Sequence, residues 1–414
     1  MVEKSLDKKL AEIHADPSGS RAFIIADAKD ADMAFGITAT GRYSPEYHHG
    51  EVQFKSIHEY RDMMRQVVQQ GLVDIMLMSA SSNEVLTIQE RLFDQSHITP
   101  AARANDTSDI HVMRGSSYFT MASRPFRTAT IDHIQCGKQE CSPDERNLGA
   151  NLGLYSLTFN NDIERDLYTL ERFKEFRIEA ERKGFRYFME VFDPNVPEAI
   201  DPQTLGQFIN DAITRTLAGV TQKGRPVFLK IVYHGPQAME ELVHFDPHLV
   251  VGILGGGAGT TYDAFKLLAE AQKYGARAAL YGRKINNAEH QLSFIAFLRL
   301  IADGEISPEE AVKAYHGVLQ GLGIKPQRSL EEDSRLTSGV MSYGGNGTTV
   351  TIPAGTPATS PRERREPAPA AEQRQAVKSA QIPEAEDDGT PDFSKMTAVE
   401  KLEYNQRERD RIFG

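Results

Sequence analysis

The stretch Pro226–Gly235, PVFLKIVYHG, places a lysine inside an apolar, β-branched run. Runs of this kind are typical of strands in a parallel sheet that is covered on both faces. A lysine is almost never buried without a reason, because burial disfavours its charged form. Lys230 is therefore either a neutral amine that can attack a carbonyl and form a Schiff base, or a strand-end side chain whose ammonium reaches water.

The chain on both sides of this stretch alternates apolar strands with helices, which is typical of α/β proteins. Residues 80–149 are too many for one β/α unit, so we expect an insertion there. A doubly wound sheet and a (β/α)8 barrel both fit the alternation, and the presence of eight strand candidates favours the barrel. The predicted strands are Ala22–Ala26, Leu72–Ser79, Thr128–Ile134, Leu152–Phe159, Phe185–Phe192, Pro226–Tyr233, Leu249–Leu254 and Ala276–Tyr281.

Composition divides the chain into three parts. Residues 1–330 are expected to form the barrel domain. Residues 331–395 are rich in Gly, Pro, Thr and charge, and they are predicted to be disordered because they cannot bury enough apolar surface. Residues 396–414 regain helical character, with Thr397 and Glu400 at the spacing of a capping box. This helix either docks on this subunit, a neighbour or another protein, or remains solvated.

Overall charge and cysteine content limit the partners and the compartment. The net charge of −11 over 414 residues argues against nucleic acid or an anionic membrane as the main partner. No apolar run is long enough for a transmembrane helix, and the charged N-terminus lacks the apolar region of a signal peptide. The chain has only two cysteines, Cys136 and Cys141. We therefore expect a cytoplasmic location and no disulfide scaffold.

A predicted phosphate site comes from two segments near the end of the barrel. Gly255, Gly256 and Gly257 follow an apolar strand and precede a helix, so their N–H groups can cradle an anion. One β/α unit later, Gly282 and Arg283 follow another strand, and arginine forms charge-assisted hydrogen bonds to phosphate. In (β/α)8 barrels the loops after strands seven and eight often form the phosphate site. A tight turn is the alternative role for the glycine loop.

Two acidic residues accompany Lys230. Asp27 is predicted to end the first strand, where it would move a proton or orient a hydroxyl group, unless it is an ordinary loop carboxylate. Glu190 lies within the apolar strand FMEVF, where a buried carboxylate is costly unless it is paired. Lys230 is its expected partner.

The order of these residues resembles the class I, Schiff-base aldolases of the archaeal fructose-bisphosphate and tagatose-bisphosphate group, in the deoxyribose-phosphate aldolase superfamily. The resemblance spans roughly Ala22–Leu322 and rests on an aspartate after strand one, a glutamate in strand five, a lysine in strand six, GGGAG after strand seven and GRKIN after strand eight. It implies that Lys230 forms the Schiff base, with Glu190 and Asp27 as catalytic acids. It also implies that Gly255, Gly256, Gly282 and Arg283 bind the phosphate of a sugar substrate.

The sequence departs from this family at two places. The fructose enzymes carry a tyrosine on strand five where this chain has Phe192, and the tagatose enzymes carry a lysine on strand four that LGLYSLTF lacks. Tyr155 or Tyr233 would then be the proton donor, or else a packing residue. The main hypothesis is an aldolase-type lyase without a cofactor, in a homo-oligomer. The alternatives are a phosphate-barrel isomerase or synthase without an imine, and a sugar-phosphate-binding scaffold without activity.

A metal site is the weakest possibility. His133, Cys136 and Cys141 lie close together in the sequence and are of the types that bind zinc. No fourth ligand is nearby, so no metal is expected.

Overall fold

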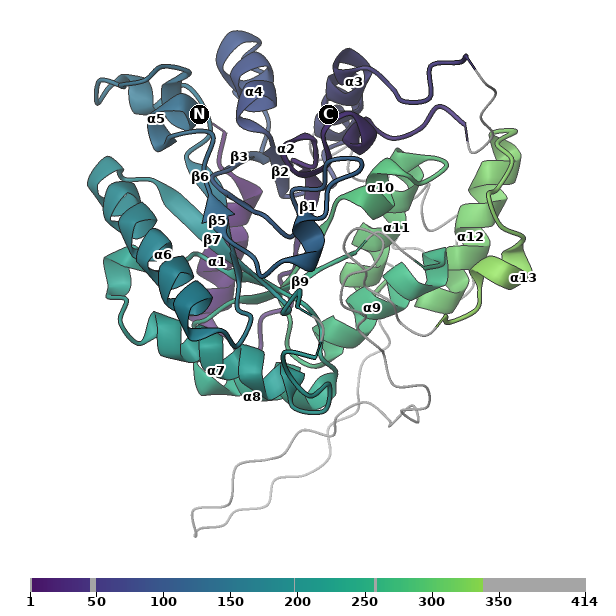
Figure 1. Cartoon of the computed structure of the whole chain (residues 1–414). Helices are drawn as coiled ribbons and strands as arrows, with labels where there is room; N and C mark the ends of the chain where they lie inside the picture. The colour runs from purple at the N-terminus through teal and green to yellow at the C-terminus, as the bar shows by residue number, and fades with distance from the viewer. Residues whose placement is uncertain (1, 45–49, 197, 257–258, 338–414) are drawn as a thin grey trace, which may run out of the picture. The chain divides into compact units, whose positions relative to one another are not determined.

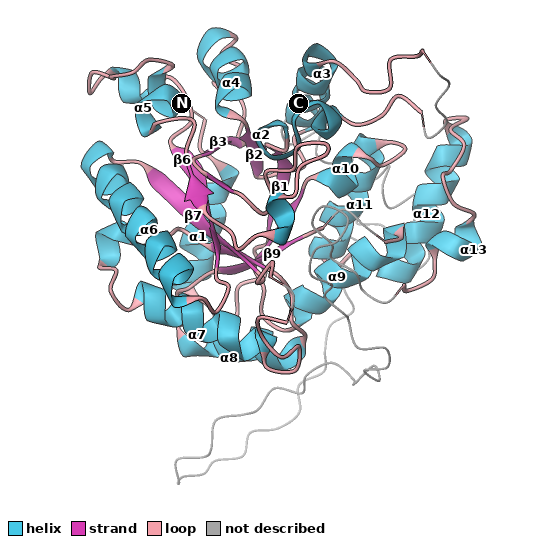
Figure 2. Ribbon diagram, in the orientation of Figure 1, coloured by secondary structure: helices cyan, strands magenta, loops and turns pink. Residues whose placement is uncertain are grey.

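The protein is described by a computed structural model that covers residues 2–44, 50–196, 198–256 and 259–337. Within these residues, eight parallel strands close into a barrel in the order β1-β10-β9-β8-β7-β6-β3-β2, which confirms the predicted (β/α)8 barrel (Figure 2). The barrel strands are β1 (Ile24–Lys29), β2 (Ile75–Met78), β3 (Thr99–Arg103), β6 (Leu152–Thr158), β7 (Arg186–Phe192), β8 (Leu229–Ile231), β9 (Val251–Leu254) and β10 (Ala278–Tyr281).

Helices surround the strands (Figure 1). The α-helices are α1 (Ser5–Ala15), α2 (Asp32–Phe35), α3 (Ile57–Gln70), α4 (Ala80–Asn83), α5 (Ile131–Cys136), α6 (Ile163–Lys183), α7 (Leu205–Leu217), α8 (Pro236–Phe245), α9 (Thr261–Lys273), α10 (Arg283–Asn286), α11 (Gln291–Ala302), α12 (Pro308–Gly321) and α13 (Leu330–Asp333). Several begin with a capping box, in which a serine or threonine side chain and an acidic residue three positions later bind each other's backbone N–H; α3, α9 and α12 are examples.

The N-terminal helix α1 (Ser5–Ala15) closes one end of the barrel. Its apolar residues Leu6, Leu10 and Ile13 are buried in the same cluster as the inward-facing residues of the strands. Lys9 Nζ donates a hydrogen bond to the carbonyl oxygen of Phe23, just before β1, at 2.9 Å. The N-terminal ends of the strands are thereby covered, and the carboxyl ends are left as the open mouth, where (β/α)8 enzymes place their active sites.

The third barrel strand is β3 (Thr99–Arg103), so the prediction of Thr128–Ile134 is wrong. Strand β3 contains Pro100, which cannot donate to a ladder, and two alanines of low β-propensity. The predicted segment instead runs into a helix, with Ile131 and Ile134 inside it: the Thr130 hydroxyl accepts from the backbone N–H of His133 and starts α5. The capping interaction outweighs strand propensity there.

The expected insertion lies between β3 and β6. It contains a short antiparallel pair, β4 (Asp106–Thr107) with β5 (Pro125–Phe126), followed by α5. Cys136 and Cys141 are joined by a disulfide, a pairing that the low cysteine content did not predict. Disulfides are rare in reducing compartments, so the cytoplasmic location stays a prediction.

Contacts of the barrel continue beyond residue 330, where the sequence placed the end of the domain. Helix α13 packs near α12, and the Asp333 side chain is buried. Thr337 N donates to Asp263 Oδ1 of α9 at 3.0 Å. Residues 338–414 lie outside the described part of the chain, so the disordered segment and the terminal helix stay predictions.

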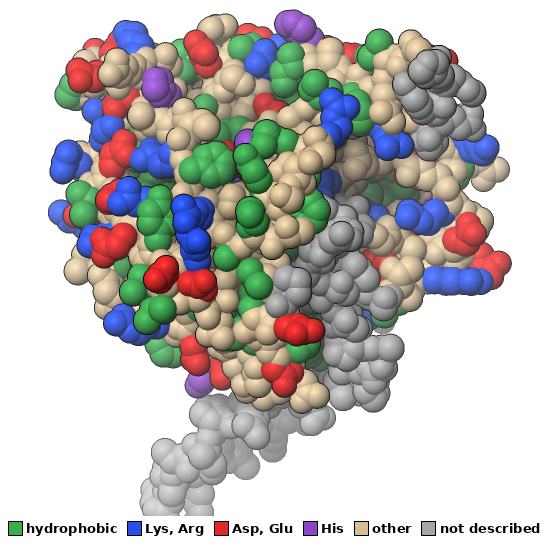
Figure 3. Space-filling view, viewed as in Figure 1, with side chains coloured by type: hydrophobic (Ala, Val, Ile, Leu, Met, Phe, Trp, Pro, Cys, Tyr) green, Lys and Arg blue, Asp and Glu red, His purple; other side chains and the backbone are tan. Residues whose placement is uncertain are grey.

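Charged side chains of both signs are interspersed on one face of the protein. On the face drawn in Figure 3, Lys and Arg alternate with Asp and Glu rather than gathering in one basic patch. This distribution agrees with the negative net charge and gives no electrostatic footprint for nucleic acid on that face. Among the described residues, no helix is both long enough and apolar enough to cross a membrane.

Candidate active site

Lys230 points into the barrel and faces a carboxylate. Alternate residues of a strand point the same way, so Lys230 of β8 lies on the inner face with Phe228. Its Nζ lies 2.5 Å from Glu190 Oε1, and the two side chains are only 5% and 0% exposed. Lys230 and Glu190 are register partners on the neighbouring parallel strands β8 and β7. The predicted pair is confirmed, and the ammonium does not reach bulk water at the barrel surface.

The second oxygen of Glu190 is also bound. Ser156 of β6, the register partner of Glu190 on its other side, donates its Oγ–H to Glu190 Oε2 at 2.6 Å. Arg103 Nη2 lies 4.0 Å from the same oxygen. Both oxygens of the buried Glu190 side chain are therefore held by neighbouring groups, one of them by the Lys230 amine.

Arg103, which the sequence analysis missed, links this pair to the end of β1. Its Nε donates to Asp30 Oδ2 at 2.5 Å, and its Nη1 lies 3.5 Å from Asp106 Oδ1. Burial opposes the Arg103 charge, but the carboxylates of Asp30 and Asp106 outweigh it and raise the arginine pKa. Burial raises the pKa of Asp106 to about 6, although Arg103 partly offsets the rise.

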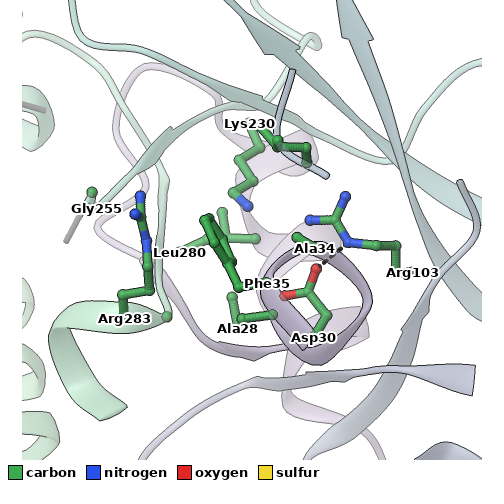
Figure 4. Close-up of a pocket in the computed structure, with 13 residues that line it drawn as sticks. Ala28, Asp30, Ala34, Phe35, Arg103, Lys230, Gly255, Leu280 and Arg283 are labelled. Atoms are coloured by element: carbon green, nitrogen blue, oxygen red, sulfur yellow. Dashed lines mark hydrogen bonds and ion pairs between the residues drawn. The ribbon is translucent and has the colours of Figure 1, made fainter. Parts of the chain in front are cut away.

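Of these groups, Lys230, Arg103 and Asp30 line one pocket at the barrel mouth, and Glu190 lies beside Lys230 (Figure 4). In this view the Lys230 amine lies between Arg103 and Asp30 on one side and Arg283 and Gly255 on the other. The structure therefore brings most of the predicted site residues to one place, and Gly257 lies outside the described residues. The polar and glycine residues of the lining are Asp30, Arg103, Lys230, Gly255, Gly256, Gly282 and Arg283.

Each described glycine of the pocket has a steric reason to be glycine. A Cβ on Gly255 would lie 2.0 Å from Tyr281 Cδ1, and one on Gly282 would lie 2.4 Å from the carbonyl oxygen of Ala28. Gly256 has a φ of +59°, which side chains rarely adopt. Packing alone thus requires glycine at positions 255 and 282. Because these two residues have no Cβ atom, a ligand can also approach their backbone. The guanidinium carbon of Arg283 lies 5.0 Å from the Phe35 ring centroid, which stabilises its position by a cation–π contact.

The start of α9, just after the glycine loop, is fixed by the chain beyond the barrel. The Thr261 N–H donates to Asp333 Oδ1 at 2.7 Å, and His316 Nε2 lies 3.0 Å from Asp333 Oδ2. Lys284 Nζ donates to the Gly259 carbonyl oxygen at 2.8 Å. Burial lowers the pKa of Lys284 to about 8. A carboxylate therefore already occupies the first turn of α9, and the loop before it is held in place from two sides.

Asp27 does not reach the pocket. Strand β1 continues to Lys29, so Asp27 lies inside the strand rather than at its end. Ala26 and Ala28 belong to the cluster inside the barrel, and Asp27 therefore faces the other way. There its Oδ2 lies 2.9 Å from Lys29 Nζ, and both side chains are fully buried. Burial raises the pKa of Asp27 although Lys29 opposes this. The acid at the end of β1 that lines the pocket is Asp30, not Asp27.

Neither tyrosine proposed as a proton donor lines the pocket. Tyr155 stacks on Phe176 of α6, with the ring centroids 4.3 Å apart, which assigns it to packing between sheet and helix. Tyr233 is fully buried, and burial raises its pKa, with Glu270 of α9 as the next cause. Phe192 stands on strand five as the sequence indicated.

The zinc alternative does not fit the structure. The two cysteines form the disulfide, and His133 Nδ1 lies 3.2 Å from the Thr130 N–H at the start of α5. In the described residues no group of three or more histidine, cysteine or acidic side chains is arranged to hold a metal ion.

Comparison with known proteins gives likeness in structure only. Neither a family model nor a curated protein sequence matches the chain. An archaeal fructose-1,6-bisphosphate aldolase, solved with its catalytic lysine covalently bound to the carbinolamine intermediate of the substrate, is similar with a TM-score of 0.51 and 15% identity over 72% of this chain and 100% of that one. A fructose-bisphosphate aldolase from Slackia heliotrinireducens is similar with a TM-score of 0.52 and 12% identity over 76% of this chain and 91% of that one.

A second structure of an archaeal fructose 1,6-bisphosphate aldolase gives a TM-score of 0.50 and 14% identity, and it covers 72% of this chain and 99% of that one. At these identities the likeness establishes a shared fold. Chemistry has to be argued from the pocket.

Proposed function

We propose that the protein is an aldolase-type lyase of class I, in which Lys230 forms a Schiff base with a phosphorylated ketose or a related carbonyl compound. The observation that carries this proposal is the buried Lys230 amine, 2.5 Å from Glu190 and in one pocket with Gly255, Gly256 and Arg283. A carbonyl compound with an anionic end would meet a nucleophile and an anion site together. The shared fold with Schiff-base aldolases supports the same reading.

Glu190 is placed to move the protons of such a reaction. In the resting site the ammonium of Lys230 is paired with the Glu190 carboxylate, so the proton must leave before the amine can attack. Glu190 takes it, and the free amine adds to the carbonyl carbon. The carbinolamine then loses water, with the proton returned by Glu190, and leaves an iminium ion. The iminium accepts the electron pair of the bond between the α and β carbons as that bond breaks, and an enamine remains on the lysine. The proton that Asp30 takes from the hydroxyl group on the β carbon is returned to the α carbon, which restores the iminium, and water then releases the product from the lysine.

Asp30 takes the role that the sequence analysis assigned to Asp27. Its carboxylate lines the pocket next to Arg103. There it accepts the proton of the hydroxyl group on the β carbon, the carbon atom that leaves when the carbon–carbon bond breaks. Abstraction of that proton turns the hydroxyl carbon into the carbonyl of the leaving aldehyde. Gly255, Gly256, Gly282 and Arg283 hold the phosphate, and we propose that Gly257, the next residue in the sequence after Gly256, also binds it. We keep the homo-oligomer and the docking role of residues 396–414 as further proposals.

Turnover in the presence and absence of borohydride tests this function. The purified protein is given a panel of phosphorylated ketoses, and the released aldehyde is measured by a coupled assay. We expect carbon–carbon cleavage that is lost irreversibly when borohydride and substrate are added together, and Lys230→Arg should show neither cleavage nor inactivation. Turnover that survives borohydride would favour the isomerase or synthase. Binding of the compounds without any turnover would favour the scaffold.

A further inference from the structure

An arginine lies at each of the two ends of the pocket. At one end Arg283 lies near Gly255, and at the other Arg103 lies beside Asp30, with the Lys230 amine between them (Figure 4). A carbonyl compound bound at Lys230 therefore extends in two directions, and each direction meets a guanidinium. Whether the Arg103 end takes an anion depends on the charges that already surround Arg103.

The Arg103 end carries its own counter-charges. Asp30 Oδ2 accepts from Arg103 Nε at 2.5 Å, Asp106 Oδ1 lies 3.5 Å from Nη1, and Glu190 Oε2 lies 4.0 Å from Nη2. Arg103 and Asp106 are each nine-tenths or more buried, as are Asp30 and Glu190. Two cations, Arg103 and Lys230, thus face three carboxyl groups, and this end has no positive charge in excess.

A phosphate at the Arg103 end would be repelled. It carries a charge near −2 at neutral pH and would lie within a few ångströms of the carboxylates that already hold Arg103. A hydroxyl group suits the same place, because it can donate to the Asp30 carboxylate and accept from the guanidinium. The pair is a polar, overall uncharged surface for hydroxyl groups.

We propose that the Arg103–Asp30 pair is the hydroxyl-binding end of the pocket, and that the substrate is a carbonyl compound with phosphate at one end only. A ketose monophosphate has this chemistry and a ketose bisphosphate does not. The inference rests on the proposed function, since it takes Lys230 as the point at which the carbonyl is held. Asp30 is then the residue that sets the preference.

Saturation of the lysine adduct measures the preference in the full-length protein. The protein is treated with borohydride over a range of fructose 1-phosphate or fructose 1,6-bisphosphate concentrations, and the fraction of reduced adduct is read from the intact mass. We expect the half-saturating concentration of the monophosphate to be lower than that of the bisphosphate by a factor of about ten or more. Equal or tighter saturation by the bisphosphate overturns the inference and leaves the Schiff base in place. An adduct with neither compound removes the proposed function and the inference with it.

Asp30→Asn tests the cause of the preference. The substitution keeps the shape of the side chain and removes one negative charge beside Arg103, so the ratio of the two half-saturating concentrations should shift about ten-fold toward the bisphosphate. Asp62→Asn on the exposed side of α3 is the matched control and should leave the ratio unchanged. Circular dichroism verifies that both variants are folded. A folded Asp30→Asn with the wild-type ratio contradicts the assignment of Asp30, and the wild-type ratio alone still decides the inference if that variant does not fold.

Discussion

The Lys230 amine lies 2.5 Å from the Glu190 carboxylate because the two residues are register partners on adjacent strands of a closed barrel. The distance is set by backbone hydrogen bonding, so it does not depend on a mobile loop. Ser156 extends the same layer to a third strand and binds the other Glu190 oxygen. Three consecutive strands thereby hold Lys230, which we propose as the nucleophile, Glu190, which we propose as its proton acceptor, and Ser156, which binds the second oxygen of Glu190.

Replacing Glu190 by Gln should damage both catalysis and stability. Without the carboxylate, the Lys230 proton has no acceptor, and turnover should fall about 10²-fold or more. The buried ammonium also loses its partner, which costs about 3–5 kcal/mol of unfolding free energy unless the amine becomes neutral. Steady-state kinetics and urea denaturation measure the two effects.

The matched control for this variant is Glu175→Gln, on the exposed face of α6, where the side chain is 55% exposed. It should change neither quantity. A Glu190→Gln protein with wild-type turnover would remove Glu190 from the proton transfers proposed above.

Removal of the Asp333 carboxylate should weaken phosphate binding from outside the pocket. In Asp333→Ala the Thr261 N–H loses its acceptor and the start of α9 is no longer tied to His316. We expect a loss of about 1 kcal/mol in stability, as for other helix caps, together with weaker binding of inorganic phosphate. Calorimetric titration with phosphate measures the second effect. Glu331→Ala, at an exposed neighbouring position on α13, is the control. Equal phosphate affinity in both variants would show that the contacts of Asp333 with Thr261 and His316 do not position the glycine loop before α9.

Asp106 should make the protein less stable as the pH rises from about 4 to about 6. Its folded-state pKa is raised to about 6 by burial, whereas an unfolded aspartate titrates near 3.9. In this window the folded state binds more protons than the unfolded state, so the free energy of unfolding decreases with increasing pH, by up to about 3 kcal/mol for this group. Asp106→Asn should flatten that part of the curve. Urea denaturation across pH 4–7 tests it, and parallel curves for the two proteins would contradict the assignment.

The strands that are largely apolar runs could be predicted from the sequence. Strand β3 and the charged end of β1 could not. The sequence could predict that Lys230, Gly255, Gly256 and Arg283 come together in one pocket, and that Glu190 lies beside Lys230. Each of these residues lies in or just after an apolar strand, and the strands share one barrel. Their roles in binding and catalysis stay proposals.

The misses have a common cause. Strand β3 contains a proline and two alanines, so neither the strand nor its final residue, Arg103, could be recognised from pattern. Strand β1 runs through Asp27 to Lys29, because these two side chains neutralise each other on the buried outer face. A pattern of apolar residues ends at the first charged residue, so the sequence placed the end of β1 at Asp27, whereas the acid after β1 that lines the pocket is Asp30.

Peptide mapping of the reduced adduct shows whether the Lys230 amine becomes covalently bound to the substrate carbonyl. The protein is incubated with dihydroxyacetone phosphate, reduced with borohydride, digested and analysed by tandem mass spectrometry. We expect a single modified lysine, Lys230, with no adduct on the fully buried Lys29 or on Lys284, and no adduct in Lys230→Arg. If the folded wild-type protein carries no adduct at Lys230 across the panel of sugar phosphates, or carries it on another lysine, Lys230 does not form the Schiff base.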